Sequence, residues 1–168
     1  MTSWTVRDRR PGDDAALRAL NQANVPEVGP LDDERLALFA EQACRFQVVV
    51  DEGAVLGLFV GLTEGVPYDS PNYRWFSERH ERFAYVDRIA LAPELRGEGV
   101  ADALYAAFED LAASTGRPVV CAEVNVEPPN PRSMRFHERR GFEVVGEQAP
   151  YGTDERVAMV EKRTSAGG

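Results

Sequence analysis

The sequence predicts a mixed α/β fold in a single domain. Its 168 residues are the size of one domain and are enough to bury a sizeable core. Apolar segments of strand length alternate with amphipathic segments of helix length, and glycine or proline separates most of them. A chain with this alternation is expected to pack its helices against a central sheet.

The first half of the chain predicts three strands and two helices. A turn at Pro11-Gly12 opens the first helix, in which Leu17 and Leu20 share one face. The second helix begins at about Asp32. Glu52-Gly53 separates two apolar runs and therefore predicts a β-hairpin. The strands of this half are expected at residues 4–7, 46–51 and 54–62.

The second half contains the strongest helix signal. Residues 63–81 are too polar and too interrupted for a strand, and they predict a functional loop with a short helix. The helix at 99–115 carries apolar residues along one face and is terminated by Gly116 and Pro118. Another short helix is expected at 131–140. The remaining strands are expected at 83–91, 119–126, 142–147 and 156–161, which gives the order β-α-α-β-β-β-α-β-α-β-β. The domain is expected to span 1–163, with a disordered tail at 164–168.

Composition and charge exclude several classes of partner. The net charge of −9 argues against nucleic acid, because phosphate binding needs clustered lysine and arginine. It fits either simple solubility or the steering of a cationic substrate. No apolar run reaches the ~20 residues of a membrane span, and the first residues lack a secretory signal. Two widely spaced cysteines are compatible with a reducing compartment, so a cytoplasmic location is expected.

The segment from Arg88 to Ala101 carries the most specific chemistry. A strand ends at Pro93, and a turn containing Gly97 and Gly99 opens the strongest helix. The first turn of a helix has unpaired N–H groups and the positive end of the dipole, so it suits an anion. Glycine lets a phosphate approach the backbone, and Arg96 supplies a charge. The alternative is an ordinary strand-to-helix turn.

Two motifs resemble the GNAT acyltransferase superfamily. Arg96-x-x-Gly99-x-Ala101 is similar to its R/Q-x-x-G-x-G/A signature for acetyl-CoA. The run from Asn130 to Phe142 is similar to the second family signature, with His137 at a position that is commonly tyrosine. That histidine makes the chain resemble the phosphinothricin-acetyltransferase type. The resemblance spans nearly the whole chain.

The resemblance implies an acetyl-CoA-dependent N-acetyltransferase that transfers directly to a primary amine of a small molecule or peptide. It implies a mixed sheet of about six to seven strands, splayed between the fourth and fifth strands, with the pantetheine arm in the gap. It also implies a homodimer. Cofactor contacts are implied for Ile89, Ala90, Leu91, Arg96, Gly97, Glu98, Gly99, Val100, Ala101, Asn130 and His137. The Glu98 side chain is expected to point to solvent, and Asn130 could instead cap its helix.

Acetyl transfer needs a neutral amine and, for the leaving thiolate, a proton donor. His137 is the candidate acid, since an imidazolium can protonate a thiolate near neutral pH; the alternative is that it only packs. Asp87, Glu123 and Glu64 are candidate bases, and for Asp87 and Glu123 the alternative is a structural ion pair with arginine. Neither cysteine is expected to act as a nucleophile.

No metal site is expected, because the two histidines lack ligand spacing. The acceptor site implied by the resemblance contains Glu27, Tyr68, Tyr73 and Trp75, whose carboxylate and aromatic faces suit a cationic amine. The aromatic residues could equally cover the core. Two other functions stay open: transfer of a longer acyl group, and a non-catalytic acyl-CoA sensor or partner module.

Overall fold

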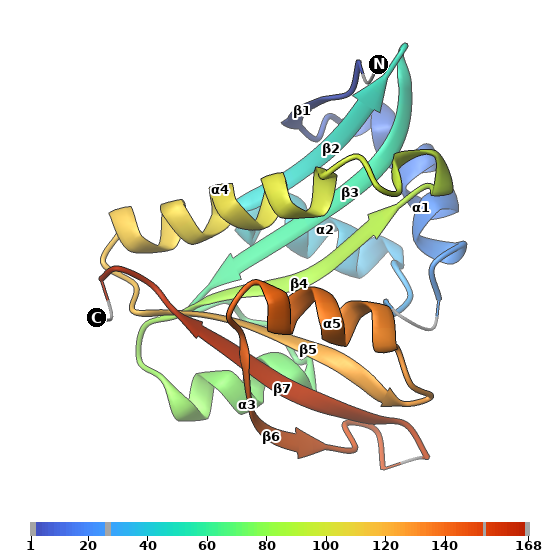
Figure 1. The fold of residues 1–168 in the computed structure, drawn as a ribbon. Coiled ribbons are helices and arrows are strands. Elements are labelled where there is room, and N and C mark those ends of the chain that lie inside the picture. The colour runs from blue at the N-terminus through green and yellow to red at the C-terminus, as the bar shows by residue number, and fades with distance from the viewer. Residues whose placement is uncertain (1–2, 26–27, 153, 167–168) are drawn as a thin grey trace. The chain divides into compact units, whose positions relative to one another are not determined.

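The protein, represented by a computed structural model, contains one mixed seven-stranded sheet with the strand order β1-β2-β3-β4-β5-β7-β6 (Figure 1). The structure describes residues 3–25, 28–152 and 154–166. The elements in chain order are β1 (Thr5–Asp8), η1 (Pro11–Asp13), α1 (Asp14–Gln22), α2 (Asp33–Gln42), β2 (Arg45–Asp51), β3 (Ala54–Thr63), α3 (Pro71–Arg79), β4 (Ala84–Leu91), η2 (Pro93–Leu95), α4 (Val100–Ser114), β5 (Val119–Glu127), α5 (Pro131–Arg139), β6 (Glu143–Gln148) and β7 (Arg156–Arg163). The predicted α/β class and element order are confirmed.

The chain divides into two compact units. The first unit comprises residues 1–62 and 86–108, and the second comprises 63–85 and 109–168.

The first unit is built on the antiparallel strands β1, β2 and β3. The predicted hairpin turns at Glu52 and Gly53, whose φ angles of 49° and 80° are both positive. Aromatic side chains contribute to the packing of helices α4 and α2 in this unit. Phe59 of β3 packs against Phe108 of α4 with ring centroids 5.4 Å apart. Arg88 of β4 lies over Phe39 of α2, 5.2 Å from the ring centroid.

The second unit is built on β5, β6 and β7. The antiparallel register places Cys121 of β5 opposite Glu161 of β7. Parallel pairing joins Ala84 to Val120 and Tyr85 to Cys121 at the start of β4. Successive residues of a strand face opposite sides. Accordingly Glu161 contacts His80 after α3, whereas Lys162 contacts Glu109 of α4, so helical segments lie on both faces.

Side-chain caps explain where several helices begin. Asp32 accepts a hydrogen bond from the Arg35 amide at 2.8 Å and starts α2. Asn130 accepts from the Ser133 amide at 3.2 Å and starts α5, with Pro131 at the first helical position. Ser70 caps α3, which is the helix expected inside the 63–81 loop.

The described structure continues beyond the predicted end of the domain. Thr164 is buried; its hydroxyl donates to the Arg117 carbonyl at 2.6 Å, and its amide donates to the Pro118 carbonyl at 3.0 Å. Thr164 is therefore hydrogen-bonded to the segment before β5, and the domain limits of 1–163 with a tail at 164–168 stay a prediction. Gly167 and Gly168 lie outside the described residues.

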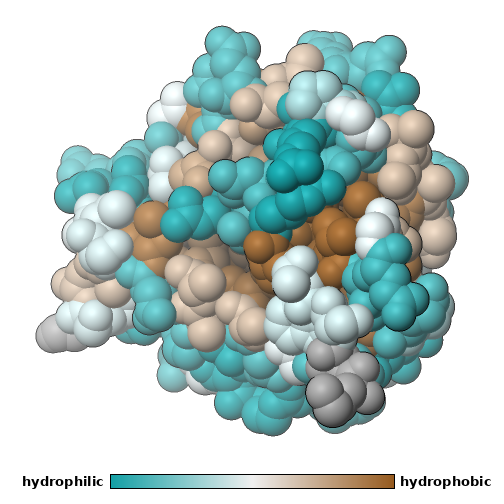
Figure 2. Space-filling model, turned by 90° about the horizontal axis from the view of Figure 1, so that it is seen from above, coloured by the Kyte–Doolittle hydropathy of each residue, from teal (hydrophilic) through white to brown (hydrophobic). Residues whose placement is uncertain are grey.

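Among the described residues, many large apolar side chains are buried, including Phe39, Phe59 and Phe108. Hydrophilic residues cover the greater part of the face drawn in Figure 2. Among the described residues, no helix has both the length and the apolar character needed to cross a bilayer.

Candidate functional site

The turn that opens α4 has the conformation that the glycines were expected to provide. Gly97 and Gly99 have φ angles of 78° and 76°, a region that favours glycine. The Gly99 carbonyl accepts from the Ala103 amide at 3.0 Å and so begins the helical ladder. In a helix that starts there, the amides of Val100 and Ala101 have no acceptor within the helix.

Space for a ligand exists at both glycines. A Cβ atom added to Gly97 or to Gly99 would meet no atom within 4 Å. Arg96 and Glu98 are exposed on either side of Gly97. This turn is therefore an accessible, positively polarised backbone surface that fits a phosphate group.

Two backbone amides of the turn already donate to carbonyl groups of the protein. The amide of Arg96 donates to the Pro93 carbonyl at 3.1 Å, and that of Glu98 donates to the Leu95 carbonyl at 3.3 Å. These two amides stabilise the short helix η2 and its exit. The anion donors are consequently concentrated in the first turn of α4.

Asp87, the candidate base on β4, belongs to a buried polar network in the first unit. Asp87 and Arg88 form an ion pair of 2.7 Å, and their side chains are only 3% and 2% exposed. Arg88 also donates to the Asn21 side chain at 2.8 Å and to the Gly29 carbonyl at 2.9 Å. Arg88 therefore holds the end of α1 and the α1–α2 connection, and Asp87 balances its charge. Of the two readings of Asp87, the geometry favours the structural pair.

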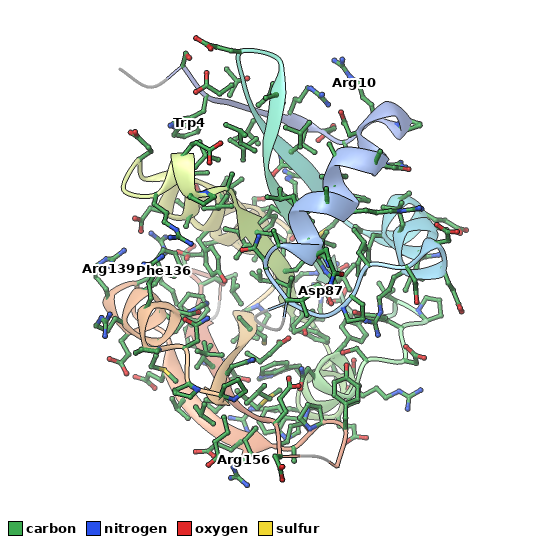
Figure 3. The ribbon with its side chains drawn as sticks, turned by 90° about the vertical axis from the view of Figure 1, so that its right-hand side faces the viewer. Trp4, Arg10, Asp87, Phe136, Arg139 and Arg156 are labelled. Atoms are coloured by element: carbon green, nitrogen blue, oxygen red, sulfur yellow. The ribbon has the colours of Figure 1, made fainter. Side chains whose placement is uncertain are left out.

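His137 lies on α5 in the second unit and is almost fully buried. Its Nδ1 donates to the Ser133 carbonyl at 2.8 Å. The ring also lies edge-on to Phe142 and to Phe136, which is labelled on α5 in Figure 3. Burial, assisted by the charge of Arg140, lowers the pKa of His137 below its ordinary value of 6.5, although the bond to Ser133 opposes this. The ring is therefore mainly neutral near pH 7, where a protonated ring was expected.

Glu123 lies half-buried on β5 and accepts a hydrogen bond of 2.7 Å from the Tyr85 hydroxyl. Tyr85 is completely buried, so its phenol fixes the carboxylate of Glu123 in one orientation. In this contact the partner of Glu123 is a phenol, and the ion pair with arginine stays a prediction.

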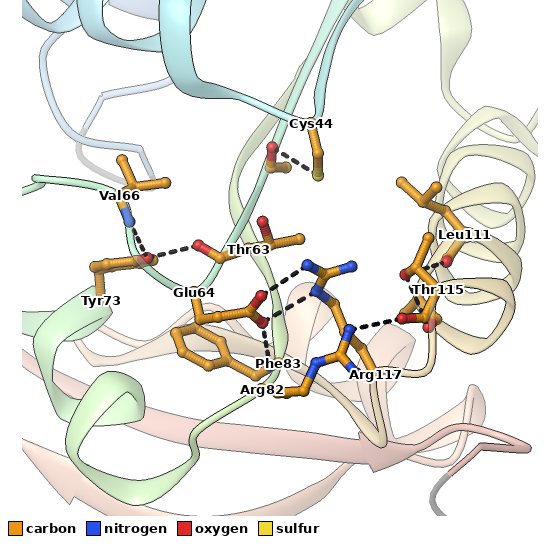
Figure 4. A network of polar contacts seen from close by, with 12 residues as sticks. Cys44, Thr63, Glu64, Val66, Tyr73, Arg82, Phe83, Leu111, Thr115 and Arg117 are labelled. Atoms are coloured by element: carbon orange, nitrogen blue, oxygen red, sulfur yellow. Dashed lines mark hydrogen bonds and ion pairs between the residues drawn. The ribbon is translucent and has the colours of Figure 1, made fainter.

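The residues expected to bind the amine acceptor mostly contact other residues of the protein. The Tyr73 hydroxyl donates to the Thr63 carbonyl at 2.6 Å and accepts from the Val66 amide at 3.1 Å (Figure 4). Burial raises the pKa of Tyr73. Tyr68 is buried, with its ring centroid 5.7 Å from that of Tyr73, and Trp75 packs against Gly146. Glu27 lies outside the described residues.

The residues from Asp87 to Ala101 lie in the first unit. The second unit holds the remaining described candidates, namely Tyr68, Tyr73, Trp75, Glu123, Asn130 and His137. Asn130 caps α5, so its side-chain oxygen already serves the helix. Cys121 is fully buried and its pKa is raised by burial, which agrees with the expectation that it is no nucleophile.

One group of residues was not predicted from the sequence. His80, Cys121 and Glu161 each offer a metal-ligating atom, and these atoms all lie within 4.8 Å of one another. Spacing between histidines could not reveal this group, because its members come from three separate segments.

Comparison with known proteins decides the family. The profile of the acetyltransferase (GNAT) family matches residues 15–142. The chain belongs to the GNAT family. The matched range includes both the α4 turn and α5, so the two motifs fall inside the family region. Members of this family use acetyl-CoA.

Individual relatives agree with this assignment. The acetyltransferase Atu2258 of Agrobacterium fabrum is 30% identical over 79 residues, which is 47% of this chain and 55% of that protein. The crystal structure of Ard1 from Thermoplasma volcanium has a TM-score of 0.76 at 21% identity, covering 96% of this chain and 98% of that one. Chaetomium thermophilum Naa20, solved with a bisubstrate analogue, has a TM-score of 0.77 at 22% identity, covering 97% and 88%. The solved structures show that the chain has the GNAT fold.

Proposed function

We propose that this GNAT protein is an acetyl-CoA-dependent N-acetyltransferase that acts on the primary amine of a small molecule or peptide. Bound acetyl-CoA supplies a thioester whose carbonyl carbon the amine attacks, so that a C–N bond forms and the C–S bond breaks. The observation that carries the proposal is the open glycine turn at the start of α4, inside the region that matches the family.

The first turn of α4 binds the diphosphate in this proposal. The amides of Val100 and Ala101 donate to the phosphate oxygens, and the helix dipole adds a favourable field. Arg96 is exposed beside them and contributes a charge-assisted hydrogen bond. Along β4, the backbone of Ile89, Ala90 and Leu91 holds the pantetheine arm.

Glu123 is the better of the two base candidates on the strands β4 and β5. The Asp87 carboxylate is almost fully buried and ion-paired with Arg88, whereas Glu123 is half-buried and accepts a hydrogen bond from the Tyr85 hydroxyl. We assign His137 a minor role as the acid that protonates the leaving thiolate. Its lowered pKa leaves little imidazolium near neutral pH, and a thiolate leaves well without assistance. Replacing His137 by Asn is therefore expected to lower kcat by less than the ~10²–10⁴ typical of a general acid.

A non-catalytic acyl-CoA sensor is the second candidate function. It is favoured by the ion pair of Asp87 and by the buried, neutral state of His137. Incubating the protein with acetyl-CoA and a panel of primary amines, while following thiol release, separates the two. Amine-dependent release supports the transferase. Tight CoA binding with no release from any amine supports the sensor.

A glycine substitution tests the binding turn independently of turnover. Gly97→Ala places a methyl group in the cradle, and CoA is expected to bind about tenfold more weakly or worse. Gly53→Ala is the matched control, because Gly53 has a φ of 80° and equally open surroundings in the β2–β3 hairpin. Both variants carry the same backbone strain, roughly 1–2 kcal/mol. Equal CoA affinity of the two variants, measured by calorimetry, would contradict the placement of the diphosphate.

A further inference from the structure

We propose that His80, Cys121 and Glu161 form a binding site for one Zn²⁺ ion. The three residues belong to the second unit and lie outside the residues assigned to acetyl transfer, so the proposal does not depend on that function. Their nitrogen, sulfur and oxygen ligand atoms lie within 4.8 Å of one another.

The strands fix two of the three ligands. Cys121 of β5 and Glu161 of β7 are direct partners in the antiparallel register. Side chains of directly opposite residues project from the same face of the sheet with Cβ atoms about 5 Å apart. The sheet therefore presents a thiol and a carboxylate side by side, and neither depends on a loop for its position.

The end of α3 supplies the third ligand. The His80 amide donates to the Phe76 carbonyl at 2.9 Å, which completes the last turn of α3. The chain then becomes extended, and the imidazole Nε2 lies 2.5 Å from Glu161 Oε2. The ring also lies against Phe83, 6.4 Å between centroids. His80 is thus held over the face that carries Cys121 and Glu161.

The donor set selects the ion. Mixed nitrogen, sulfur and oxygen ligands suit Zn²⁺, whereas Ca²⁺ and Mg²⁺ prefer oxygen alone. Tetrahedral Zn²⁺ with ligands at about 2.0–2.3 Å needs ligand atoms about 3.3–3.8 Å apart. Small side-chain movements reach this spacing: the thiol approaches, and the His80–Glu161 contact opens. A water molecule would complete the coordination.

Charge and access are compatible with an ion at this place. Arg79 Nε donates to Glu161 Oε2 at 3.0 Å, a contact that can orient the carboxylate as an outer-shell hydrogen bond. The His80 and Arg79 side chains are 14% and 43% exposed, so the ion can enter on their side. On binding, Zn²⁺ displaces the proton of the Cys121 thiol, which passes to solvent. The hydrogen between His80 Nε2 and Glu161 moves to Nδ1 of the same ring, so that neutral imidazole offers Nε2 to the ion.

Metal analysis of the tag-free full chain tests the site. The protein is mixed with ZnCl₂, dialysed against metal-free buffer and analysed by mass spectrometry for zinc per chain. Wild type is expected to retain one ion, and the near-isosteric Cys121→Ser variant is expected to retain almost none. Cys44→Ser is the matched control, because Cys44 is the other cysteine and lies in the first unit; it is expected to retain one ion.

Two further measurements keep the test decisive if Cys121→Ser does not fold. Co²⁺ in place of zinc is expected to give a thiolate-to-metal absorption band with wild type. That band should be lost in His80→Gln, which changes a partly exposed side chain. Zinc absent from wild type, zinc retained equally in Cys121→Ser, or a Co²⁺ spectrum without a thiolate band would each overturn the proposal.

Discussion

Arg88 carries a full charge at a place where its side chain is almost completely removed from water. The cost is offset by Asp87, by the Asn21 side chain and by the Gly29 carbonyl. Breaking one member of such a pair costs more than replacing both members, because an uncompensated charge then stays buried.

Arg88→Met is therefore expected to lower the free energy of unfolding by roughly 3–5 kcal/mol. The Asp87→Asn/Arg88→Met double variant should recover a substantial part of that loss, since it removes both charges. Urea denaturation of the three proteins measures this difference. A double variant that is less stable than Arg88→Met would show that charge compensation is not the role of Asp87.

The burial of His137 is expected to make the free energy of unfolding depend on pH. Its folded-state pKa is lowered, so the unfolded chain binds more protons at pH values between the folded pKa and 6.5. The stability contribution of the neutral ring is complete above 6.5 and is lost as the pH falls below it. His137→Asn should consequently lose less unfolding free energy than wild type between about pH 8 and pH 5.5. Urea titrations at both pH values measure this, and parallel losses in the two proteins would contradict it.

At the scale of elements, the contact between β3 and α4 depends on the absence of a side chain. A Cβ atom added to Gly61 would overlap the ring of Phe108, which also packs against Phe59. β3 and α4 are therefore as close together at this point as a residue without a side chain allows.

Gly61→Ala should destabilise the protein by roughly 1–3 kcal/mol through overpacking. Gly12→Ala is the control, because a methyl group there would meet nothing within 4 Å. Thermal denaturation of the two variants is the measurement. A Gly61→Ala melting temperature equal to that of Gly12→Ala would show that Phe108 can move aside at little cost.

For the whole molecule, the net charge of −9 is expected to attract a cationic acceptor. If the acceptor is a cationic amine, raising the ionic strength should screen the attraction and lower kcat/KM. An amine of similar size that also carries a carboxylate should respond much less. Steady-state rates at about 10 mM and about 150 mM salt, where the Debye lengths are about 30 and 8 Å, measure the difference. Equal salt dependence would leave solubility as the role of the charge.

The sequence by itself determined the elements and the α4 turn. Strand alternation, capping residues and glycines act over a few neighbouring residues, so the hairpin at Glu52-Gly53 and the glycine-opened start of α4 could be predicted closely. The motif at Arg96 to Ala101 likewise identified the family, which the match to residues 15–142 confirms.

Only the tertiary structure decided the state of the chemical groups. Whether His137 carries a proton depends on burial among Phe136 and Phe142, and the contacts of Tyr73 depend on Thr63 and Val66. The grouping of His80 with Cys121 and Glu161 requires α3, β5 and β7 to meet. Protonation, pairing and ligation follow from desolvation and from neighbours that are distant in sequence, and local patterns carry no information about either.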